Sequence, residues 1–410
     1  MFEALTVAVS TDLRFGDRVK LTYNGRKIEG MFISLEHGLI TLKLGNGYNI
    51  VLQEDEFRPD QVTKAENKPE RRPRSVDVKN GVKILATGGT IASRIDYTTG
   101  AVKPSPEVIS ALETGEQNVG YSVIDDILSE NMTPEKWIYI AKKTKEELDR
   151  GNHVVILHGT DTMTYTASAL AFMLERQSRS VILTGSQRSS DRPSSDAFEN
   201  ISSSIMFTAL NAGEVCISMH GSISDFSGRL MRGTRSRKMH TSRRDAIRPV
   251  DGRYLARIED GVAIKEAEFR STGEDSVLIP KMDSRAAILY FYPGMDPGIF
   301  ETIAQKNDAI VIMGTGLGHV SESIISEVRK AHGSGVHIVM TSQCIAGNTN
   351  LNVYSTGREL KAAGAISAGD ILPEVALTKA MFLLANHSDE FEKLMQIPMR
   401  GEIEERLRIE

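Results

Sequence analysis

Apolar runs of strand length alternate with stretches of helical spacing over most of the chain. The apolar runs are continuous, as in strands buried on both faces of a parallel sheet. The expected strands are residues 82–86, 153–157, 181–184 and 215–218, and the expected helices are residues 134–150 and 163–176. This order predicts the α/β class, with a doubly wound parallel sheet.

A second set of apolar runs follows a looser, polar stretch. Strands are expected at residues 287–291, 309–313 and 336–340. The pattern predicts two lobes, with residues 81–250 as the larger lobe, 251–284 as the connection and 285–410 as a smaller α/β lobe with a C-terminal tail. Residues 401–410 are charged with scattered apolar positions, so we expect a solvated tail, as a surface helix or an interaction segment.

The first 65 residues have a different texture. Short β-prone runs are separated by Asn24-Gly25, His37-Gly38 and Asn46-Gly47, which favour hairpin turns. We expect residues 1–65 to form a small all-β, barrel-like domain. Residues 66–80 combine prolines with dense basic charge, which is typical of a solvated linker. The β domain either has a structural role, covering a sheet edge or buttressing a dimer, or docks a partner, and docking is the favoured hypothesis.

Composition and charge narrow the class of protein. The chain has 410 residues, 40% hydrophobic and 25% charged, with a formal net charge of -5, which indicates a folded protein and argues against a free-standing nucleic-acid binder. Its two cysteines, Cys216 and Cys344, lie in or beside apolar runs, so we expect buried, reduced thiols. No apolar run approaches bilayer length and the first residues lack a signal-peptide pattern, so we expect no membrane association and a cytoplasmic location.

Two segments rich in small hydroxyl residues carry the candidate chemistry. Residues 87–93, Thr-Gly-Gly-Thr-Ile-Ala-Ser, and 158–163, His-Gly-Thr-Asp-Thr-Met, each follow a predicted strand. Because the carboxyl ends of parallel strands meet at one edge of a sheet, both segments are expected in one cleft. A threonine nucleophile needs a base and a group that orients the base, and Thr160, Lys238 and Asp161 can form such a relay. The alternative is structural, a tight bend in the first segment and a helix cap at Thr160.

Other signals are weaker. Residues 314–318 give only a Gly-x-Gly-x-Gly run, and the chain lacks the phosphate-binding Gly-x-x-x-x-Gly-Lys-Ser/Thr motif. His158 and His220 lack a second histidine at metal-ligand spacing, so we expect structural histidines and no bound metal. Trp137 lies at helical spacing from apolar neighbours and is expected in the core. Seven arginines between residues 229 and 248 either face a nucleic acid or a partner, or pair with the protein's own carboxylates, which is the favoured interpretation.

Together the two segments resemble the bacterial-type L-asparaginase and glutaminase family, over roughly residues 81–390. Residues 96–100, Asp-Tyr-Thr-Thr-Gly, resemble its mobile loop, and residues 129–132, Ser-Glu-Asn-Met, its substrate-clamping segment. The resemblance implies an asparaginase-like two-lobed fold and a threonine acyl-enzyme mechanism. Which threonine attacks first stays open. The implied catalytic residues are Thr90, Tyr97, Thr160, Asp161 and Lys238, and the implied substrate-binding residues are Gly89, Ser129, Glu130 and Gly159.

The roughly 80 residues before the first segment make the chain resemble the D-type subunits of archaeal glutamyl-tRNA(Gln) amidotransferases. That resemblance implies ammonia release from glutamine or asparagine, used by an E-type partner subunit to convert Glu-tRNA(Gln) to Gln-tRNA(Gln). It further implies that this chain binds no cofactor, with ATP, magnesium and most tRNA contacts on the partner, and a homodimer within a two-plus-two heterotetramer. The alternatives are a stand-alone cytoplasmic L-asparaginase with an accessory β domain and a catalytically silent binding protein. The complete set of catalytic residue types argues against the silent protein.

Overall fold

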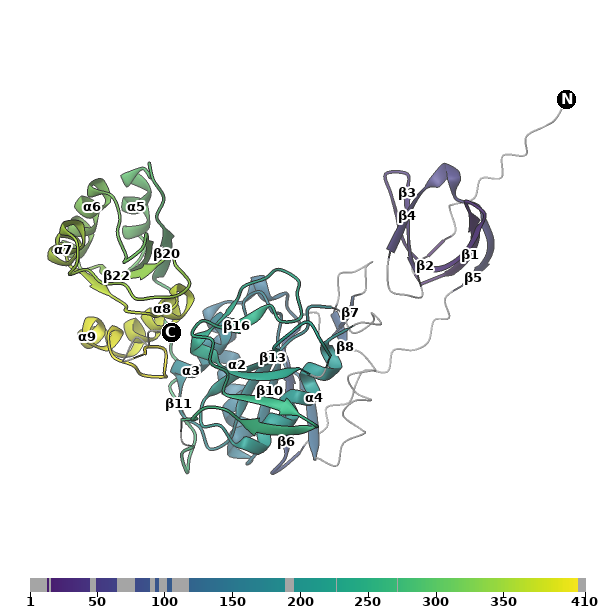
Figure 1. Ribbon diagram of the computed structural model, residues 1–410, viewed down its shortest axis with the longest axis horizontal. Helices are drawn as coiled ribbons and strands as arrows, with labels where there is room; N and C mark the ends of the chain where they lie inside the picture. Colours follow the sequence, from purple (N-terminus) through teal and green to yellow (C-terminus); the bar gives the residue numbers. More distant parts are fainter. Residues whose placement is uncertain are drawn as a thin grey trace.

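The computed structural model describes residues 13–14, 16–44, 49–64, 78–88, 93–95, 102–104, 118–188, 195–225, 227–270 and 272–404, with only the backbone at 49, 93–95 and 102–104. Figure 1 shows a β domain near the N-terminus and two α/β lobes. Among the described residues, no helix is long and apolar enough to cross a membrane.

The N-terminal β domain is one antiparallel sheet in the order β4-β3-β2-β1-β5. Its strands are β1 (Arg18–Tyr23), β2 (Arg26–Glu36), β3 (Leu39–Leu44), β4 (Asn49–Gln53) and β5 (Pro59–Thr63), with the short helix η1 (Glu54–Glu56) before β5. Asn24 and Gly25 have φ of 50° and 72°, as a tight hairpin turn between β1 and β2 requires. The sheet encloses its own core around Val19, Phe32 and Leu42. The predicted all-β domain is therefore confirmed.

The larger lobe is built on an eight-stranded sheet in the order β18-β17-β14-β13-β12-β10-β6-β9. The strands are β6 (Val82–Ala86), β9 (Val119–Val123), β10 (His153–Leu157), β12 (Val181–Thr184), β13 (Val215–His220), β14 (Gly228–Arg232), β17 (Ala256–Glu259) and β18 (Val262–Lys265). The five strands from β13 to β9 in this order are parallel, as expected for β6, β10, β12 and β13 from their continuous apolar runs. Strand β9, which reads Val-Gly-Tyr-Ser-Val, was not predicted. The other three extend the sheet antiparallel, past residue 250, where we expected the larger lobe to end.

Among the residues that the structure describes, three helices accompany this sheet, with several short elements around them. The helices are α2 (Pro134–Asp149), α3 (Met163–Met173) and α4 (Ala197–Phe207). The expected helix 163–176 is three residues too long, because Leu174–Arg176 pairs with another strand instead. The short elements are β7 (Ser93–Ile95), β8 (Val102–Pro104), β11 (Leu174–Arg176), β15 (Ser236–Lys238), β16 (Ile247–Pro249), β19 (Val277–Leu278), η2 (Ser129–Asn131), η3 (Thr208–Leu210) and η4 (Gly233–Arg235).

The smaller lobe contains a parallel sheet in the order β20-β21-β22-β23. Its strands are β20 (Ala286–Tyr290), β21 (Ala309–Gly314), β22 (His337–Ser342) and β23 (Ala365–Ser367). Its helices are α5 (Pro297–Ala304), α6 (Glu322–Gly333), α7 (Ser355–Ala362), α8 (Pro373–Asn386), α9 (Phe391–Met395) and the short η5 (Ser388–Glu390). The predicted second α/β lobe is confirmed.

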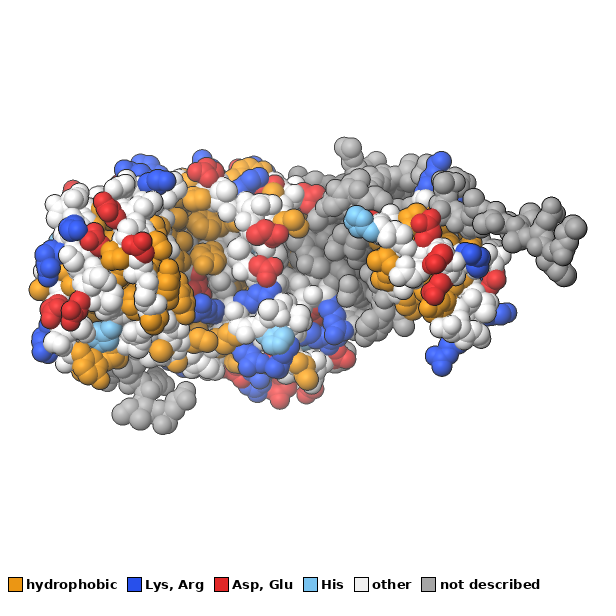
Figure 2. Space-filling view, turned by 90° about the horizontal axis from the view of Figure 1, so that it is seen from above, with side chains coloured by type: hydrophobic (Ala, Val, Ile, Leu, Met, Phe, Trp, Pro, Cys, Tyr) orange, Lys and Arg blue, Asp and Glu red, His pale blue; other side chains and the backbone are white. Residues whose placement is uncertain are grey.

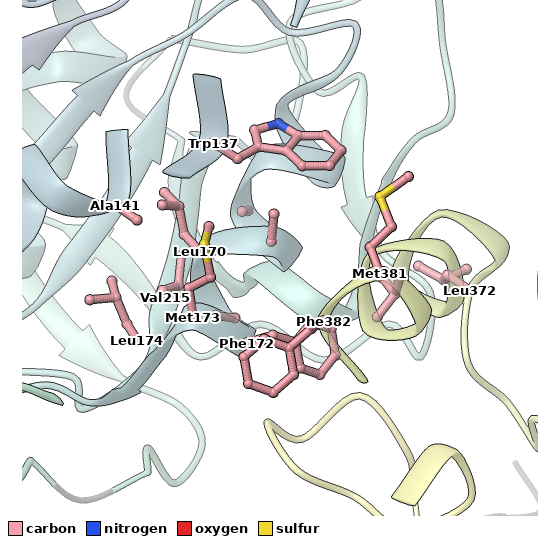
Figure 3. Packing of buried hydrophobic residues seen from close by; sticks show 14 of the residues in the cluster. Trp137, Ala141, Leu170, Phe172, Met173, Leu174, Val215, Leu372, Met381 and Phe382 are labelled. Carbon is pink, nitrogen blue, oxygen red and sulfur yellow. The ribbon is translucent and has the colours of Figure 1, made fainter. Parts of the chain in front are cut away.

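Helices α3 and α8 join the two lobes through one continuous apolar core. Figure 3 shows Phe172 of α3 beside Phe382 of α8, and their ring centroids lie 6.1 Å apart. Ser168 and Thr378 add a buried hydroxyl–hydroxyl hydrogen bond of 2.5 Å. The lobes are thus packed against each other and not merely tethered.

Two expectations about buried side chains were wrong. Cys344 is exposed in the loop after β22, whereas Cys216 is buried in β13 and both are free thiols. The C-terminal tail is not solvated throughout, because Glu402 is fully buried against Lys379 of α8, with Nζ and Oε1 2.6 Å apart. In both cases the burial is decided by tertiary neighbours that the local pattern does not reveal.

Candidate active site

The carboxyl ends of β6 and β10 lie side by side. The strands pair in parallel, with Leu157 opposite Ala86. The backbone N–H and the hydroxyl of Thr87 both donate to the Leu157 carbonyl oxygen, at 3.0 and 2.9 Å. For the part of the two predicted segments that the structure describes, the expected juxtaposition at one sheet edge is therefore present.

Two glycines at this edge allow backbones and side chains to approach closely. Gly88 has a φ of +110°, and a Cβ there would lie 2.4 Å from the Ile127 carbonyl oxygen. A Cβ at Gly159 would lie 2.6 Å from the Cβ of Ser129. Neither position has room for a side chain, so both segments fit tightly against the 127–129 loop.

Lys238 of β15 is brought to Thr160 and Asp161 from almost eighty residues away. Its Nζ lies 2.8 Å from Thr160 Oγ1 and 2.8 Å from Asp161 Oδ1. Thr160 is only 7% exposed, whereas the Asp161 side chain is 68% exposed. A primary amine bonded to both a hydroxyl and a carboxylate is the geometry that a threonine–lysine–aspartate relay requires.

Ser129 lies in the same neighbourhood, and Glu130 follows it in the same short helix. Ser129 is buried in η2, and its carbonyl oxygen accepts a 2.6 Å hydrogen bond from the Thr162 hydroxyl. Glu130, the next residue, is exposed. The structure thus groups Ser129, Gly159, Thr160, Asp161 and Lys238. Thr90, Tyr97 and Gly89 lie outside the described residues.

The basic residues around Lys238 are paired within the chain. Each of the seven arginines lies within ion-pair distance of a carboxylate, so the interpretation that they pair internally is confirmed. The pairs are Arg229–Glu266, Arg232–Glu214, Arg235–Asp370, Arg237–Glu374, Arg243–Asp245, Arg244–Asp225 and Arg248–Asp245. On the face shown in Figure 2, the described basic and acidic side chains of the two lobes are interspersed.

Arg235 connects this site to the smaller lobe. It is almost fully buried in η4, directly before the strand that carries Lys238, and it pairs with Asp370 at 2.8 Å. Its guanidinium also donates to the Glu402 carbonyl oxygen at 3.1 Å. This role was not predicted, since an arginine among six others in the sequence gives no signal of burial.

The two histidines near the candidate site are buried. Burial lowers the pKa of His158 to about 4, so its ring is neutral at pH 7. The His220 Nδ1 atom lies 2.7 Å from Asn200 Oδ1. No group of three or more potential metal ligands occurs among the residues that the structure describes.

Two family models match this chain, one over most of the larger lobe and one over most of the smaller lobe. Residues 81–270 match the family model "Asparaginase, N-terminal", and residues 285–397 match "Glutaminase/Asparaginase C-terminal domain". Among solved structures, the thermostable L-asparaginase from Thermococcus kodakarensis is similar, with a TM-score of 0.73, 28% identity, and coverage of 79% of this chain and 99% of that chain. L-asparaginase I from Vibrio cholerae gives a TM-score of 0.69 with the same identity and coverage.

Similarity over nearly the whole chain, β domain included, is found with the D-type subunit of glutamyl-tRNA(Gln) amidotransferase. The protein from Thermoplasma volcanium is 45% identical over 397 residues, covering 95% of this chain and 98% of the relative. That from Thermoplasma acidophilum is 46% identical, covering 95% and 97%. The asparaginase-like fold is thereby confirmed, and the chain belongs to the family of D-type subunits of glutamyl-tRNA(Gln) amidotransferase.

Proposed function

We propose that this chain is the amidohydrolase subunit of a tRNA-dependent amidotransferase, a carbon–nitrogen ligase that takes its amido group from glutamine or asparagine. The observation that carries the proposal is the contact of Lys238 with both Thr160 and Asp161. The nearly full-length similarity to the D-type relatives supports the amidotransferase over a stand-alone asparaginase, since the solved asparaginases match only 79% of this chain.

The chemistry is a threonine acyl transfer. A threonine hydroxyl adds to the side-chain amide carbon, the C–N bond breaks, and the nitrogen leaves as ammonia with the hydroxyl proton. Water then cleaves the acyl ester, which gives the free acid and restores the hydroxyl. Thr90 is the proposed attacking residue and Tyr97 its assistant, both carried over from the family resemblance.

Lys238 has two uses in this scheme. As an amine it accepts a proton from Thr160 while the Thr160 oxygen takes one from the water that cleaves the acyl ester, and as an ammonium it returns a proton to the departing threonine oxygen. Asp161 holds the amine in place, with its oxygen 2.8 Å from Nζ. Ser129, Glu130, Gly89 and Gly159 are proposed to bind the substrate, and the tight contact between Gly159 and Ser129 supports including these two.

The ammonia is proposed to pass to the E-type partner. That partner would bind ATP, magnesium and most of Glu-tRNA(Gln), while this chain binds no cofactor. Two copies of each protein would form the complex, in the cytoplasm. The internal pairing of the arginines near Lys238 supports leaving most tRNA contacts to the partner.

The test is glutamine-dependent conversion of Glu-tRNA(Gln) in the presence of ATP, comparing this chain alone, the E-type partner alone and the mixture. Conversion only in the mixture, lost with Lys238→Ala, supports the proposal. Full-rate ammonia release from asparagine by this chain alone, with no tRNA conversion on mixing, would identify the stand-alone asparaginase instead.

A further inference from the structure

A chain of three buried side chains runs from α2 to the loop that carries Thr160. Trp137 Nε1 lies 3.0 Å from Thr166 Oγ1, which lies 2.9 Å from His158 Nε2. The other ring nitrogen, His158 Nδ1, lies 2.7 Å from the Gly159 carbonyl oxygen. Trp137 is 5%, Thr166 0% and His158 1% exposed, and Figure 3 shows Trp137 within the shared core.

The direction of each hydrogen bond follows from donor and acceptor types. The indole N–H only donates and the Gly159 carbonyl oxygen only accepts. His158 therefore carries its proton on Nδ1, and its Nε2 accepts from the Thr166 hydroxyl, which in turn accepts from Trp137. Every polar side-chain atom in this series is satisfied in this one arrangement. The low pKa of His158 fits the single ring proton that it requires.

These contacts fix the orientation of the peptide that joins Gly159 to Thr160. The described residues contain no cis peptide bond, so the Gly159 carbonyl and the Thr160 N–H point in opposite directions. Because His158 holds the carbonyl oxygen toward the interior, the Thr160 N–H is turned away from the buried ring. Two groups of Thr160 are therefore held in place. Lys238 binds its hydroxyl, and His158 fixes the direction of its N–H through the Gly159 carbonyl.

We infer that His158, supported by Thr166 and Trp137, is a positioning unit that aims the Thr160 N–H at the carbonyl oxygen of the substrate amide. The inference rests on the proposed function. Negative charge develops on the substrate carbonyl oxygen as the Thr90 hydroxyl adds to the carbonyl carbon. A correctly aimed N–H therefore stabilises the transition state more than it stabilises the bound substrate. Loss of the unit should therefore lower kcat and leave KM nearly unchanged.

The first experiment compares Thr166→Val with Thr144→Val in the full chain, assayed for ammonia release from glutamine and asparagine. Thr144 is a matched control, because it is fully buried in α2 and its hydroxyl has no hydrogen-bond partner among the described residues. For Thr166→Val we expect kcat to fall about tenfold with KM within about twofold, and for Thr144→Val no change. A wild-type kcat in folded Thr166→Val protein would overturn the inference.

If Thr166→Val folds poorly, two variants of His158 test the positioning role instead. In His158→Asn the amide N–H can donate to Gly159 from about the Nδ1 position, whereas His158→Leu has no donor. We expect the Asn variant to retain about tenfold more kcat than the Leu variant. Equal kcat in the two folded proteins would contradict the positioning role, as would ¹⁵N resonances that place the His158 proton on Nε2.

Failure of the inference is distinguishable from failure of the proposed function. Wild-type protein that releases no ammonia from either amide would overturn both. Active wild-type protein with unchanged Thr166→Val kinetics would overturn the positioning unit alone.

Discussion

Lys238 is the residue on which the candidate site depends, because its Nζ contacts both Thr160 and Asp161 at 2.8 Å. Replacing it with alanine removes the amine and leaves the hydroxyl without its partner. We expect ammonia release to fall by about 100-fold or more in Lys238→Ala, with the double variant Thr160→Val/Lys238→Ala no worse than either single variant. Steady-state ammonia assays measure both effects.

Lys143 provides the matched control for Lys238. Its Nζ also lies 2.8 Å from a carboxylate oxygen, that of Glu146, but both side chains lie on the solvent side of α2. Lys143→Ala should retain wild-type turnover. Activity near wild type in Lys238→Ala, or fully additive losses in the double variant, would contradict a shared relay.

His158 makes stability depend on pH in a defined direction. Its pKa is about 4 in the folded protein because of burial, and about 6.5 in the unfolded chain. Between these values the unfolded chain binds more protons, so the free energy of unfolding falls as the pH falls from about 6.5 to about 4. From pH 7 to pH 5 this group should cost about 2 kcal/mol.

Denaturant titrations of the wild type and His158→Asn at both pH values check this contribution. The difference between the proteins isolates His158, because His153, whose pKa burial also lowers to about 4, is present in both. The variant should lose less stability on acidification. Identical pH dependence of the two proteins would contradict the buried neutral ring.

At the scale of elements, α8 and the C-terminal segment are joined by the Lys379–Glu402 pair. Both side chains are fully buried, and Lys379 Nζ also donates to the carbonyl oxygens of Met395 and Ile397, at 3.1 and 2.7 Å. Removing one member leaves a buried charge without its partner. Lys379→Met should therefore lower the free energy of unfolding by about 3 kcal/mol or more.

The exposed pair Lys393–Glu390 near the same end of the chain serves as the control, and Lys393→Met should change stability by less than about 1 kcal/mol. Chemical denaturation monitors both proteins. Equal, small losses would mean that the buried pair contributes no more than the exposed one.

Most parallel strands of the two large sheets were predictable because their apolar runs are continuous and of strand length, as at Val154–Leu157 in β10. The parallel strands β9 and β23 were not predicted, because β9 reads Val-Gly-Tyr-Ser-Val and β23 has only three residues. The antiparallel strands that extend the larger sheet were not predicted. Strand β14 reads Gly-Arg-Leu-Met-Arg, and its arginines interrupt the apolar run that would indicate a strand. Likewise, Trp137 was correctly placed in the core, but its hydrogen bond to Thr166 depends on two helices meeting. The one available signal was that a buried indole N–H usually has a partner.

The pairing of Lys238 with Thr160 and Asp161 was predicted, but the support behind it was not. Lys238 follows η4, where Arg235 is held by Asp370 and Glu402 of the smaller lobe. These contacts join residues more than 130 positions apart, and no local pattern specifies them.

At the scale of the whole molecule, the β domain has a core of its own. Its buried residues, among them Val19, Leu21 and Phe57, form a cluster that includes no described residue of the α/β lobes. Deleting residues 1–64 should therefore leave ammonia release within about threefold of wild type, since no group of the described site is removed. Conversion of Glu-tRNA(Gln) by the truncated chain mixed with the E-type partner should fall, because the β domain is expected to dock a partner.

Ammonia release and Glu-tRNA(Gln) conversion are assayed in parallel for the full chain and for the chain without residues 1–64. Loss of both would show that the β domain supports the fold of the lobes. Retention of both would contradict a docking role.

The most direct test of the central claim uses glutamine labelled with ¹⁵N in its side-chain amide. We predict that the mixture of this chain, the E-type partner, ATP and Glu-tRNA(Gln) transfers the label to Gln-tRNA(Gln). With Lys238→Ala the transfer from glutamine should be lost, whereas added ammonium chloride should still support conversion. Label transfer at the wild-type rate by Lys238→Ala would contradict the claim that this site releases the ammonia.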